Sequence, residues 1–505
     1  MDKITAPRRV REGKRSFNLV VGGFSHLISA GIAFFLTPFL IGRLGVEVYG
    51  FYPTALEAVA ITGLLTGLLN STAARYIAVE MAGGRVESAG GYFSAVFRAE
   101  RGLLLILSIP VTLLIVFCDS FFDIPAGMTG QIRLFLTLIF AAGFTDALTA
   151  VFGAAYTVSN RLDFRAAQEL AAVAVKALLL WFLLGGTFPV SIVSVGAAVL
   201  ASSLTGAAIR LFMAKWLVPE LFPIKKGISF SCLKRVLASG VWYSVNELGG
   251  WLSTGAFLIL ANLFYGAADA GVYSVAVTAS RFFGGVMAML AGTFIPTAAR
   301  QFAKGERKDL GRDVVKGEKL VGFFALVGVS LTVGFLREFF DFWLGEQNTP
   351  LLRLLTVFAI LPILSVAATL PIFNLAVVMD RLKRISLLCA GGSLFGTAAA
   401  LALAAFTDTG ILGLAVISFA VRVLWYSAFM PFVAGRLLRM SPLVFYLPVL
   451  RTYVGAAASV LLIFAVKSFC RFSSLFSLLI GGAVCLCAVL VIGFFCVFGR
   501  VKFRI

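Results

Sequence analysis

Residues 50–76 read GFYPTALEAVAITGLLTGLLNSTAARY, and residues 271–301 read GVYSVAVTASRFFGGVMAMLAGTFIPTAARQ. Each stretch begins with glycine, continues through an apolar segment long enough to cross a membrane as a helix, and reaches Thr-Ala-Ala-Arg at its end. The segments VSNRLDF (158–164) and VMDRLKR (378–384) also match, at an offset of 220 residues. These matches predict two halves of six helices each. Because six is even, the halves share one orientation and are related by an axis along the membrane normal, a symmetry found in transporters.

The composition indicates a membrane protein. Of the 505 residues, 60% are hydrophobic and 13% are charged, which leaves too little polar surface to cover a soluble globule. We therefore expect an all-α polytopic membrane protein of about fourteen transmembrane helices: an N-lobe (1–219), a C-lobe (220–437), and two further helices (438–505). The predicted spans are 17–41, 51–74, 102–118, 134–155, 169–184, 188–209, 238–264, 271–298, 320–336, 354–378, 385–406, 410–433, 452–466 and 475–498.

The formal charge of +19 follows from the topology of these spans. With the N-terminus inside, 34 of the 43 Lys and Arg residues fall in cytoplasmic segments and 6 in external loops. This asymmetry obeys the positive-inside rule and predicts a multi-pass protein with both termini in the cytoplasm. It also accounts for the basic charge without a nucleic-acid partner. The seven cysteines show no CxxC spacing, so no metal or disulfide is expected, and nothing in the sequence implies a cofactor.

The turns LIGRLGVEVYG (40–50) and LFYGAADAGVYSVA (263–276), the helix ends TAARY and TAARQ, and NRLDFRAAQ (160–168) resemble the Wzx-type polysaccharide flippases. That family belongs to the multidrug/oligosaccharidyl-lipid/polysaccharide (MOP) exporter superfamily, with the MATE drug exporters and the lipid II flippase. The resemblance implies a MATE-like fold of two six-helix lobes.

As an activity, the resemblance implies the transfer of undecaprenyl-pyrophosphate-linked oligosaccharides across the bacterial inner membrane by alternating access, for surface polysaccharide. Its implied partners are that lipid-linked oligosaccharide, membrane lipids, and a polysaccharide polymerase and glycosyltransferases. Many relatives carry an Asp-Arg pair in the seventh helix, where this chain reads LSTGAFLIL (252–260), so a role built on that pair does not transfer.

Four residues are predicted to bind substrate: Arg281, Lys176, Arg422 and Glu57. Cations inside helices suit a pyrophosphate, since a guanidinium binds such groups through two hydrogen bonds. At 100° per residue, Arg281 shares a helix face with small residues, which indicates that it faces a cavity or another helix. Aligning TALE (54–57) with TASR (278–281) places Glu57 where the second copy has Arg281, so a structural ion pair between these two is the alternative.

Further polar residues are predicted to line the cavity or to couple transport: Asp146, Glu247, Glu169, Arg165, His26, Asn70, Arg75 and Arg300. Arg165, Glu169 and Lys176 form one polar stripe, and Asp146 and His26 each lie on a face of small residues. A lone histidine more often packs and hydrogen-bonds within a core than relays protons. For Arg75 and Arg300, the alternative is an anchoring role at the cytoplasmic boundary of the membrane.

Two other function classes remain open. A MATE-type cation-coupled multidrug exporter shares the expected fold, but it should keep a carboxylate in the first helix, where residues 17–41 have none. A polytopic enzyme of glycan assembly should have a large external loop with acidic or arginine motifs. The longest external loops here, around DSFFDIPAGMTGQIR and REFFDFWLGEQNTPLLR, contain no such arrangement, so we expect a protein that is not an enzyme.

Overall fold

A computed structural model gives the fold of residues 15–122, 124–186, 188–221, 230–305, 307–379, 381–469 and 475–499. These residues form helices and connecting turns, without a β-strand among them, which confirms the predicted all-α class. By length and apolar composition, twelve helical stretches in these ranges can cross a membrane, or thirteen if the bent pair Lys308–Gly334 and Leu336–Trp343 is one span. The protein is therefore a multi-pass membrane protein.

The chain divides into two compact units. The N-terminal unit comprises Met1–Leu248 and Leu258–Gly271, and the C-terminal unit comprises Gly249–Phe257 and Val272–Ile505. The helices between residues 15 and 252 are α1 (Arg15–Leu44), α2 (Val46–Ala82), α3 (Val86–Val116), α4 (Cys118–Phe121), α5 (Thr129–Thr149), η1 (Ala150–Gly153), α6 (Ala154–Val158), α7 (Leu162–Leu184), α8 (Ile192–Leu217), η2 (Pro219–Leu221) and α9 (Phe230–Leu252).

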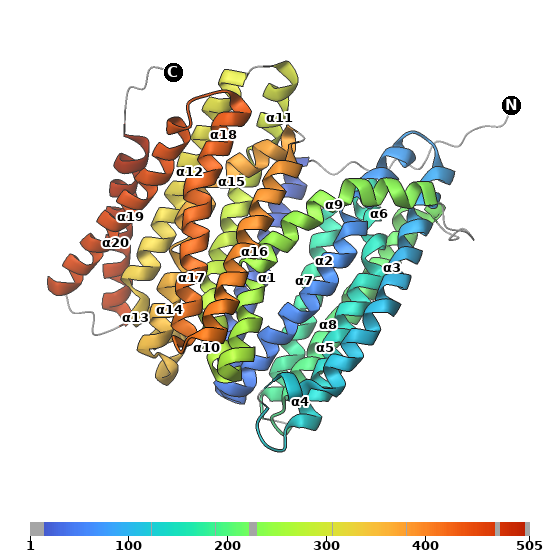
Figure 1. Cartoon of the computed structure of the whole chain (residues 1–505), viewed down its shortest axis with the longest axis horizontal. Coiled ribbons are helices and arrows are strands. Elements are labelled where there is room, and N and C mark those ends of the chain that lie inside the picture. Colours follow the sequence, from blue (N-terminus) through green and yellow to red (C-terminus); the bar gives the residue numbers. More distant parts are fainter. Residues whose placement is uncertain are drawn as a thin grey trace. The chain divides into compact units, whose positions relative to one another are not determined.

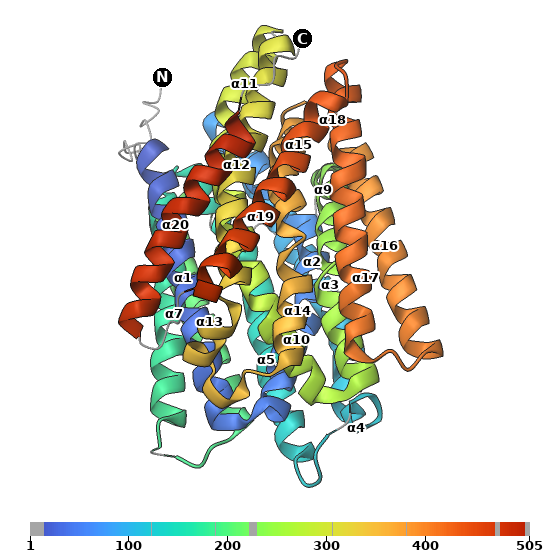
Figure 2. The same ribbon diagram turned by 90° about the vertical axis from the view of Figure 1, so that its left-hand side faces the viewer.

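The remaining helices are α10 (Gly255–Gly292), α11 (Ile295–Lys304), α12 (Arg307–Gly334), α13 (Leu336–Trp343), η3 (Gly345–Gln347), α14 (Pro350–Ile360), α15 (Ile363–Val378), α16 (Leu382–Phe406), α17 (Gly410–Leu424), η4 (Trp425–Phe429), α18 (Met430–Leu438), α19 (Leu443–Phe469) and α20 (Leu475–Phe498). Within the N-terminal unit, α5 packs on α8, α8 on α7, and α2 on α3 (Figure 1). Within the C-terminal unit, α12 packs on α15, α19 and α20 (Figure 2).

One stretch decides how many crossings the chain makes. Residues 230–302 form one continuous apolar helical stretch of 73 residues. At 1.5 Å per residue, a straight helix of this length would measure about 110 Å, whereas the hydrocarbon core of a membrane is about 30 Å thick. The α10 helix is interrupted at Gly266, whose φ of 84° and ψ of 172° lie outside the helical region. This break falls between the two spans predicted at 238–264 and 271–298, so the stretch supplies two crossings.

The backbone carries the marks of the internal repeat. Gly45, at the start of α2, has φ 78° and ψ 159°, which closely matches Gly266 in the second copy. Only glycine adopts this region readily. The turns after α6 and α15 also correspond: the Arg161 amide donates to the Tyr156 carbonyl and the Arg381 amide to the Ala376 carbonyl, both at 2.9 Å. The two halves therefore share their turn chemistry.

Glycine is required where the first copy packs against the start of the second. A Cβ atom added to Gly50 would overlap the Ala267 carbonyl oxygen, and one added to Gly271 would lie 2.6 Å from the Val46 carbonyl oxygen. Close to this contact, the buried Asn262 side chain donates to Thr54 Oγ1 at 3.3 Å. The glycine that opens each repeated stretch is thus a point of backbone contact within the N-terminal unit.

Candidate functional site

A polar cavity of about 320 Å³ lies inside the N-terminal unit, among helices that are otherwise apolar. Five segments supply its walls: α2, the end of α5 with η1, α6, α7 and α8. Four charged residues line it, and the carboxylates of Asp146 and Glu169 balance the guanidinium groups of Arg165 and Arg210. We refer to this space as the N-unit cavity.

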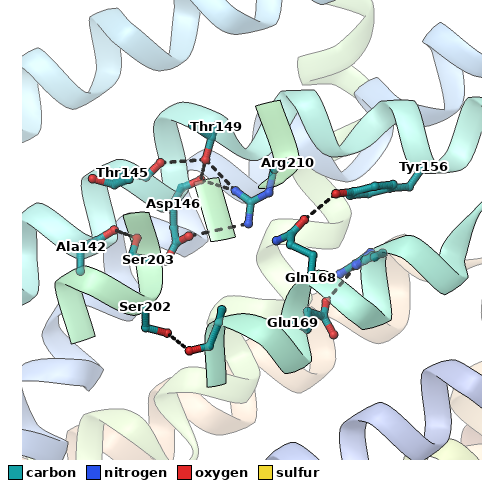
Figure 3. A network of polar contacts seen from close by, with 12 residues as sticks. Ala142, Thr145, Asp146, Thr149, Tyr156, Gln168, Glu169, Ser202, Ser203 and Arg210 are labelled. Atoms are coloured by element: carbon teal, nitrogen blue, oxygen red, sulfur yellow. Dashed lines mark hydrogen bonds and ion pairs between the residues drawn. The ribbon is translucent and has the colours of Figure 1, made fainter. Parts of the chain in front are cut away.

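Arg210 is bound where α5 tightens into the 3₁₀ turn η1. The Ala150 amide donates to the Ala147 carbonyl, one residue later than in an α-helix, so the Asp146 carbonyl must find another donor. Arg210 Nη1 donates to that carbonyl at 3.2 Å and to Thr149 Oγ1 at 2.7 Å (Figure 3). The irregular turn thereby fixes a cation beside the cavity.

The same guanidinium forms an ion pair with the Asp146 side chain. Arg210 Nη2 lies 3.7 Å from Asp146 Oδ1, with the arginine side chain 17% exposed and the aspartate 54% exposed. The carboxylate is the more open partner, so it remains available to a molecule in the cavity while the arginine is held by three oxygen atoms. A substrate hydroxyl or cation could engage Asp146 without displacing Arg210.

The α7 helix supplies the opposite wall. Arg165 Nε donates to Glu169 Oε1 at 3.0 Å, and both side chains are exposed. One residue before Glu169, the buried Gln168 accepts a hydrogen bond of 2.7 Å from the Tyr156 hydroxyl of α6 (Figure 3). The helix therefore presents an ion pair and an amide side by side, groups that suit the hydroxyl and amide groups of a sugar.

Asn70 connects the cavity to a buried acid. Its side chain lines the cavity from α2 and donates to the Thr66 carbonyl and to Glu100 Oε1. Glu100 lies on α3 and is fully buried, and its Oε2 atom has no hydrogen-bond partner among the described residues.

The structure brings four of the predicted residues together, because Asp146, Glu169, Arg165 and Asn70 all line the N-unit cavity. Lys176, half-buried further along α7, and Glu247, exposed on α9, are not among its lining residues. Arg75 is exposed, with its guanidinium 5.5 Å from the centre of the Tyr76 ring, and Arg300 is also exposed. The side chain of His26 lies outside what the structure describes.

Sequence reasoning missed Arg210, Gln168, Tyr156 and Glu100. Arg210 lies one residue beyond the predicted span 188–209, so the charge count places it in a cytoplasmic segment. The helix α8 runs on to Leu217, which places Arg210 two turns before the helix end. The sequence does carry a signal, since Arg210 follows the mostly small and hydroxyl residues ASSLTGAA (201–208).

The C-terminal unit holds a second, much tighter polar group around Arg422 of α17. The space beside it measures about 10 Å³ and is lined by Thr254, Tyr273 and Ser418 among others. Tyr426 and Tyr453 also interact electrostatically with Arg422, as does the nearby cation Arg281. Arg281 itself is exposed on α10. This unit therefore brings two of the predicted substrate cations near each other, beside tyrosines, with about 10 Å³ of space next to Arg422.

Glu57 is buried in α2, within the N-terminal unit. Its pairing with Arg281 stays a prediction. No group of three or more His, Cys, Asp or Glu side chains suited to a metal ion occurs in the described part of the chain.

Comparisons with known proteins support the fold. No protein-family model matches the sequence. An uncharacterized membrane protein of Bacillus subtilis (strain 168), EpsK, is 26% identical over 346 residues, which is 68% of each chain. Among solved structures, the lipid II flippase MurJ in an inward closed conformation superposes with a TM-score of 0.69 over 94% of this chain and 98% of its own, at 11% identity.

Two further transporter structures are similar as well. An inward-facing multidrug resistance MATE family transporter of the MOP superfamily has a TM-score of 0.62 at 14% identity, covering 86% of this chain and 99% of its own. A MOP superfamily transporter from Pyrococcus furiosus has a TM-score of 0.58 at 14% identity, covering 87% of this chain and all of its own. At these identities the likeness establishes a MurJ- and MATE-like fold.

Proposed function

We propose that this protein is a transporter that moves a lipid-linked oligosaccharide across the bacterial inner membrane by alternating access. The observation that carries the proposal is the N-unit cavity, a charged space of about 320 Å³ inside membrane-spanning helices of a MurJ- and MATE-like fold. Charged groups within a membrane are costly, and they usually mark the path of a polar substrate or ion. Two carboxylates, two guanidinium groups and two amides suit a polar, hydroxyl-rich molecule.

An apolar groove in the C-terminal unit suits the lipid part of such a substrate. It measures about 400 Å³ and is lined by residues of η4 and α19, with Leu443, Leu447 and Leu450 along it. The η4 segment is a π-helix, and its Ala428 carbonyl accepts a hydrogen bond from Tyr446 of α19. A polyprenyl chain needs a lasting apolar surface, and leucines along a helix provide one.

The charge balance of the N-unit cavity disfavours the multidrug exporter. A site for cationic drugs needs an excess of negative charge, whereas Arg165 and Arg210 neutralise Glu169 and Asp146 here. The first helix, α1, also contains neither Asp nor Glu. We retain cation-coupled drug export as the second candidate because MATE transporters share this fold. A membrane enzyme of glycan assembly is the least supported reading.

The remaining parts of the proposal follow from the same assignment. We propose cytoplasmic termini, the lobe boundaries 1–219, 220–437 and 438–505, and a polysaccharide polymerase and glycosyltransferases as functional partners. Arg281, Lys176, Arg422 and Glu57 stay substrate-binding candidates, and we add Arg210 as the fixed cation of the N-unit cavity. Such a cation would meet the phosphate or the acidic sugars of the substrate.

The proposal is tested by disrupting the gene in its own host. We expect loss of surface polysaccharide and accumulation of its lipid-linked precursor, both reversed by the wild-type gene. The variant Arg210→Gln should accumulate in the membrane without restoring export, while Arg312→Gln, which alters an exposed pair with Asp309 on α12, should restore it. Unchanged polysaccharide together with increased sensitivity to cationic drugs would instead support the multidrug exporter.

A further inference from the structure

The third helix of each half carries one buried glutamate at the same place. Residues 99–101 of α3 read Ala-Glu-Arg, and residues 317–319 of α12 read Gly-Glu-Lys. In this register Tyr92 corresponds to Leu310, Val96 to Val314 and Glu100 to Glu318, and every one of these side chains is buried. Glu100 and Glu318 are both 0% exposed. Duplication has kept a carboxyl group on the inward stripe of both helices, where apolar residues surround it.

The two carboxyl groups differ in their partners. Glu100 accepts a hydrogen bond from Asn70, but both oxygens of Glu318 lack a partner in the described part of the chain. The shared Thr-Ala-Ala-Arg register sets Ile295 of the second copy where the first has Asn70. Isoleucine offers no donor, so Glu318 has no counterpart of the Asn70 hydrogen bond.

Among the residues that the structure describes, no hydrogen bond or ion pair compensates for the burial of Glu318. The α15 helix, which packs on α12, contains no ionisable residue. On α19, Arg451 donates to the Gly499 carbonyl, Tyr453 to Ser365 Oγ, Tyr446 to the Ala428 carbonyl, and Lys467 pairs with Glu338. None of these groups forms a hydrogen bond with the Glu318 carboxyl.

Other ionisable groups on the neighbouring helices are exposed or interact with one another. Arg300 and Lys304 on α11 and Arg436 on α18 are exposed, and the described part of α20 offers only cysteines. On α12 itself, Asp313 and Lys316 pair with each other at 2.8 Å, Arg312 pairs with Asp309, and Lys319 lies near Arg451. An isolated carboxylate in such a setting costs far more than the neutral acid.

We propose that Glu318 is a proton-binding site of the C-terminal unit, matched by Glu100 in the N-terminal unit, and that proton uptake at Glu318 stabilises the packed arrangement of α12 with α15 and α19. The carboxylate takes one proton from hydronium, which leaves water, and forms the neutral acid. Loss of the proton would leave a charge that needs water, and this favours an arrangement in which that face of α12 opens. A role in coupling transport to a proton gradient rests on the proposed function, whereas the protonation itself does not.

Infrared spectroscopy of the purified full chain tests the protonation without any substrate. The wild-type protein at neutral pH should show the carbonyl stretch of a buried carboxylic acid, and Glu318→Gln should lose part of that band. Glu100→Gln should lose a further part. Glu220→Gln, at an exposed glutamate of η2, is the matched control and should keep the wild-type band. An unchanged band in Glu318→Gln would overturn the proposal.

Thermal unfolding against pH provides the second measurement. Because the unfolded chain binds fewer protons at neutral pH than the folded chain, the wild-type melting temperature should fall as pH rises, and Glu318→Gln should flatten this slope. If the melting temperature of Glu318→Gln fell with rising pH as steeply as that of the wild-type protein, the proposal would be contradicted. So would failure of Glu318→Gln to fold while Glu318→Asp folds, because a neutral side chain of the same shape could then not replace the acid.

Discussion

The two polar regions of the molecule lie in corresponding halves and yet differ in kind. The N-unit cavity encloses about 320 Å³, and Arg210 is bound by a carboxylate, a carbonyl and a hydroxyl. Arg422 of the C-terminal unit has tyrosines and a second arginine for neighbours and about 10 Å³ of space beside it. The N-terminal unit thus surrounds its fixed arginine with a charged cavity, whereas the C-terminal unit packs Arg422 closely beside tyrosine side chains.

The difference shows what the duplication has kept. Three features of the backbone occur in both halves: the positive-φ glycines at 45 and 266, the contact glycines at 50 and 271, and the turns at Arg161 and Arg381. Several polar side chains differ between the halves, since Ile295 replaces Asn70 and Arg281 replaces Glu57, while the buried acids Glu100 and Glu318 recur. We infer that the fold depends on the shared turns, while substrate binding depends on the side chains that differ.

The largest effect should come from the shared backbone contact. The change Gly50→Val places side-chain atoms where the Ala267 carbonyl lies, so we expect about 3 kcal/mol or more of destabilisation and little folded protein. Gly63→Ala is the control, because no atom lies within 4 Å of its added Cβ, and it should change stability by no more than about 1 kcal/mol. Gel-filtration profiles and melting temperatures in detergent measure both. Normal folding of Gly50→Val would show that this contact is dispensable.

A smaller but more specific effect should separate the two arginines. Arg210→Gln removes charged hydrogen bonds worth about 1.5–3 kcal/mol, so we expect transport to fall by about tenfold or more. Arg422→Gln should reduce transport less than Arg210→Gln does, since only about 10 Å³ of space lies beside Arg422. Transport rates are compared at equal amounts of folded protein. A larger loss of transport in Arg422→Gln than in Arg210→Gln would instead place the substrate site in the C-terminal unit.

The smallest effect on stability is expected at the exposed pair of α7. Arg165 and Glu169 form an exposed pair four residues apart, so Arg165→Gln should lower stability by about 0.5 kcal/mol at most. The exposed pair of Arg312 and Asp309 is a matched control of the same kind. A marked loss of transport with unchanged melting temperature would assign Arg165 to substrate binding. A drop in stability well beyond that of Arg312→Gln would show that the pair supports the fold of the cavity.

The sequence predicted the features that depend on period and spacing. Apolar length and the repeated Gly and Thr-Ala-Ala-Arg signals identified the all-α fold, and the small-residue faces around Asp146 and the spacing of Arg165 and Glu169 pointed to cavity-lining residues. Arg210 was not predicted because its hydrogen bonds depend on the 3₁₀ turn that follows α5 and on contact between α5 and α8. Neither feature can be read from local hydropathy. Glu318 was not predicted because the lysines on either side of it place it in a charged segment before the predicted span 320–336. The structure shows that α12 already begins at Arg307.

The central claim is that the protein moves a lipid-linked oligosaccharide, and purified protein in liposomes tests it most directly. Vesicles are loaded with a fluorescent polyprenyl-pyrophosphate oligosaccharide, and the fraction of its glycan exposed on the outer surface is followed with an impermeant quencher. We expect wild-type protein to accelerate exposure at least about tenfold over empty vesicles, and Arg210→Gln to remove most of that acceleration. Equal rates for wild-type protein, Arg210→Gln and protein-free vesicles would contradict the assigned activity.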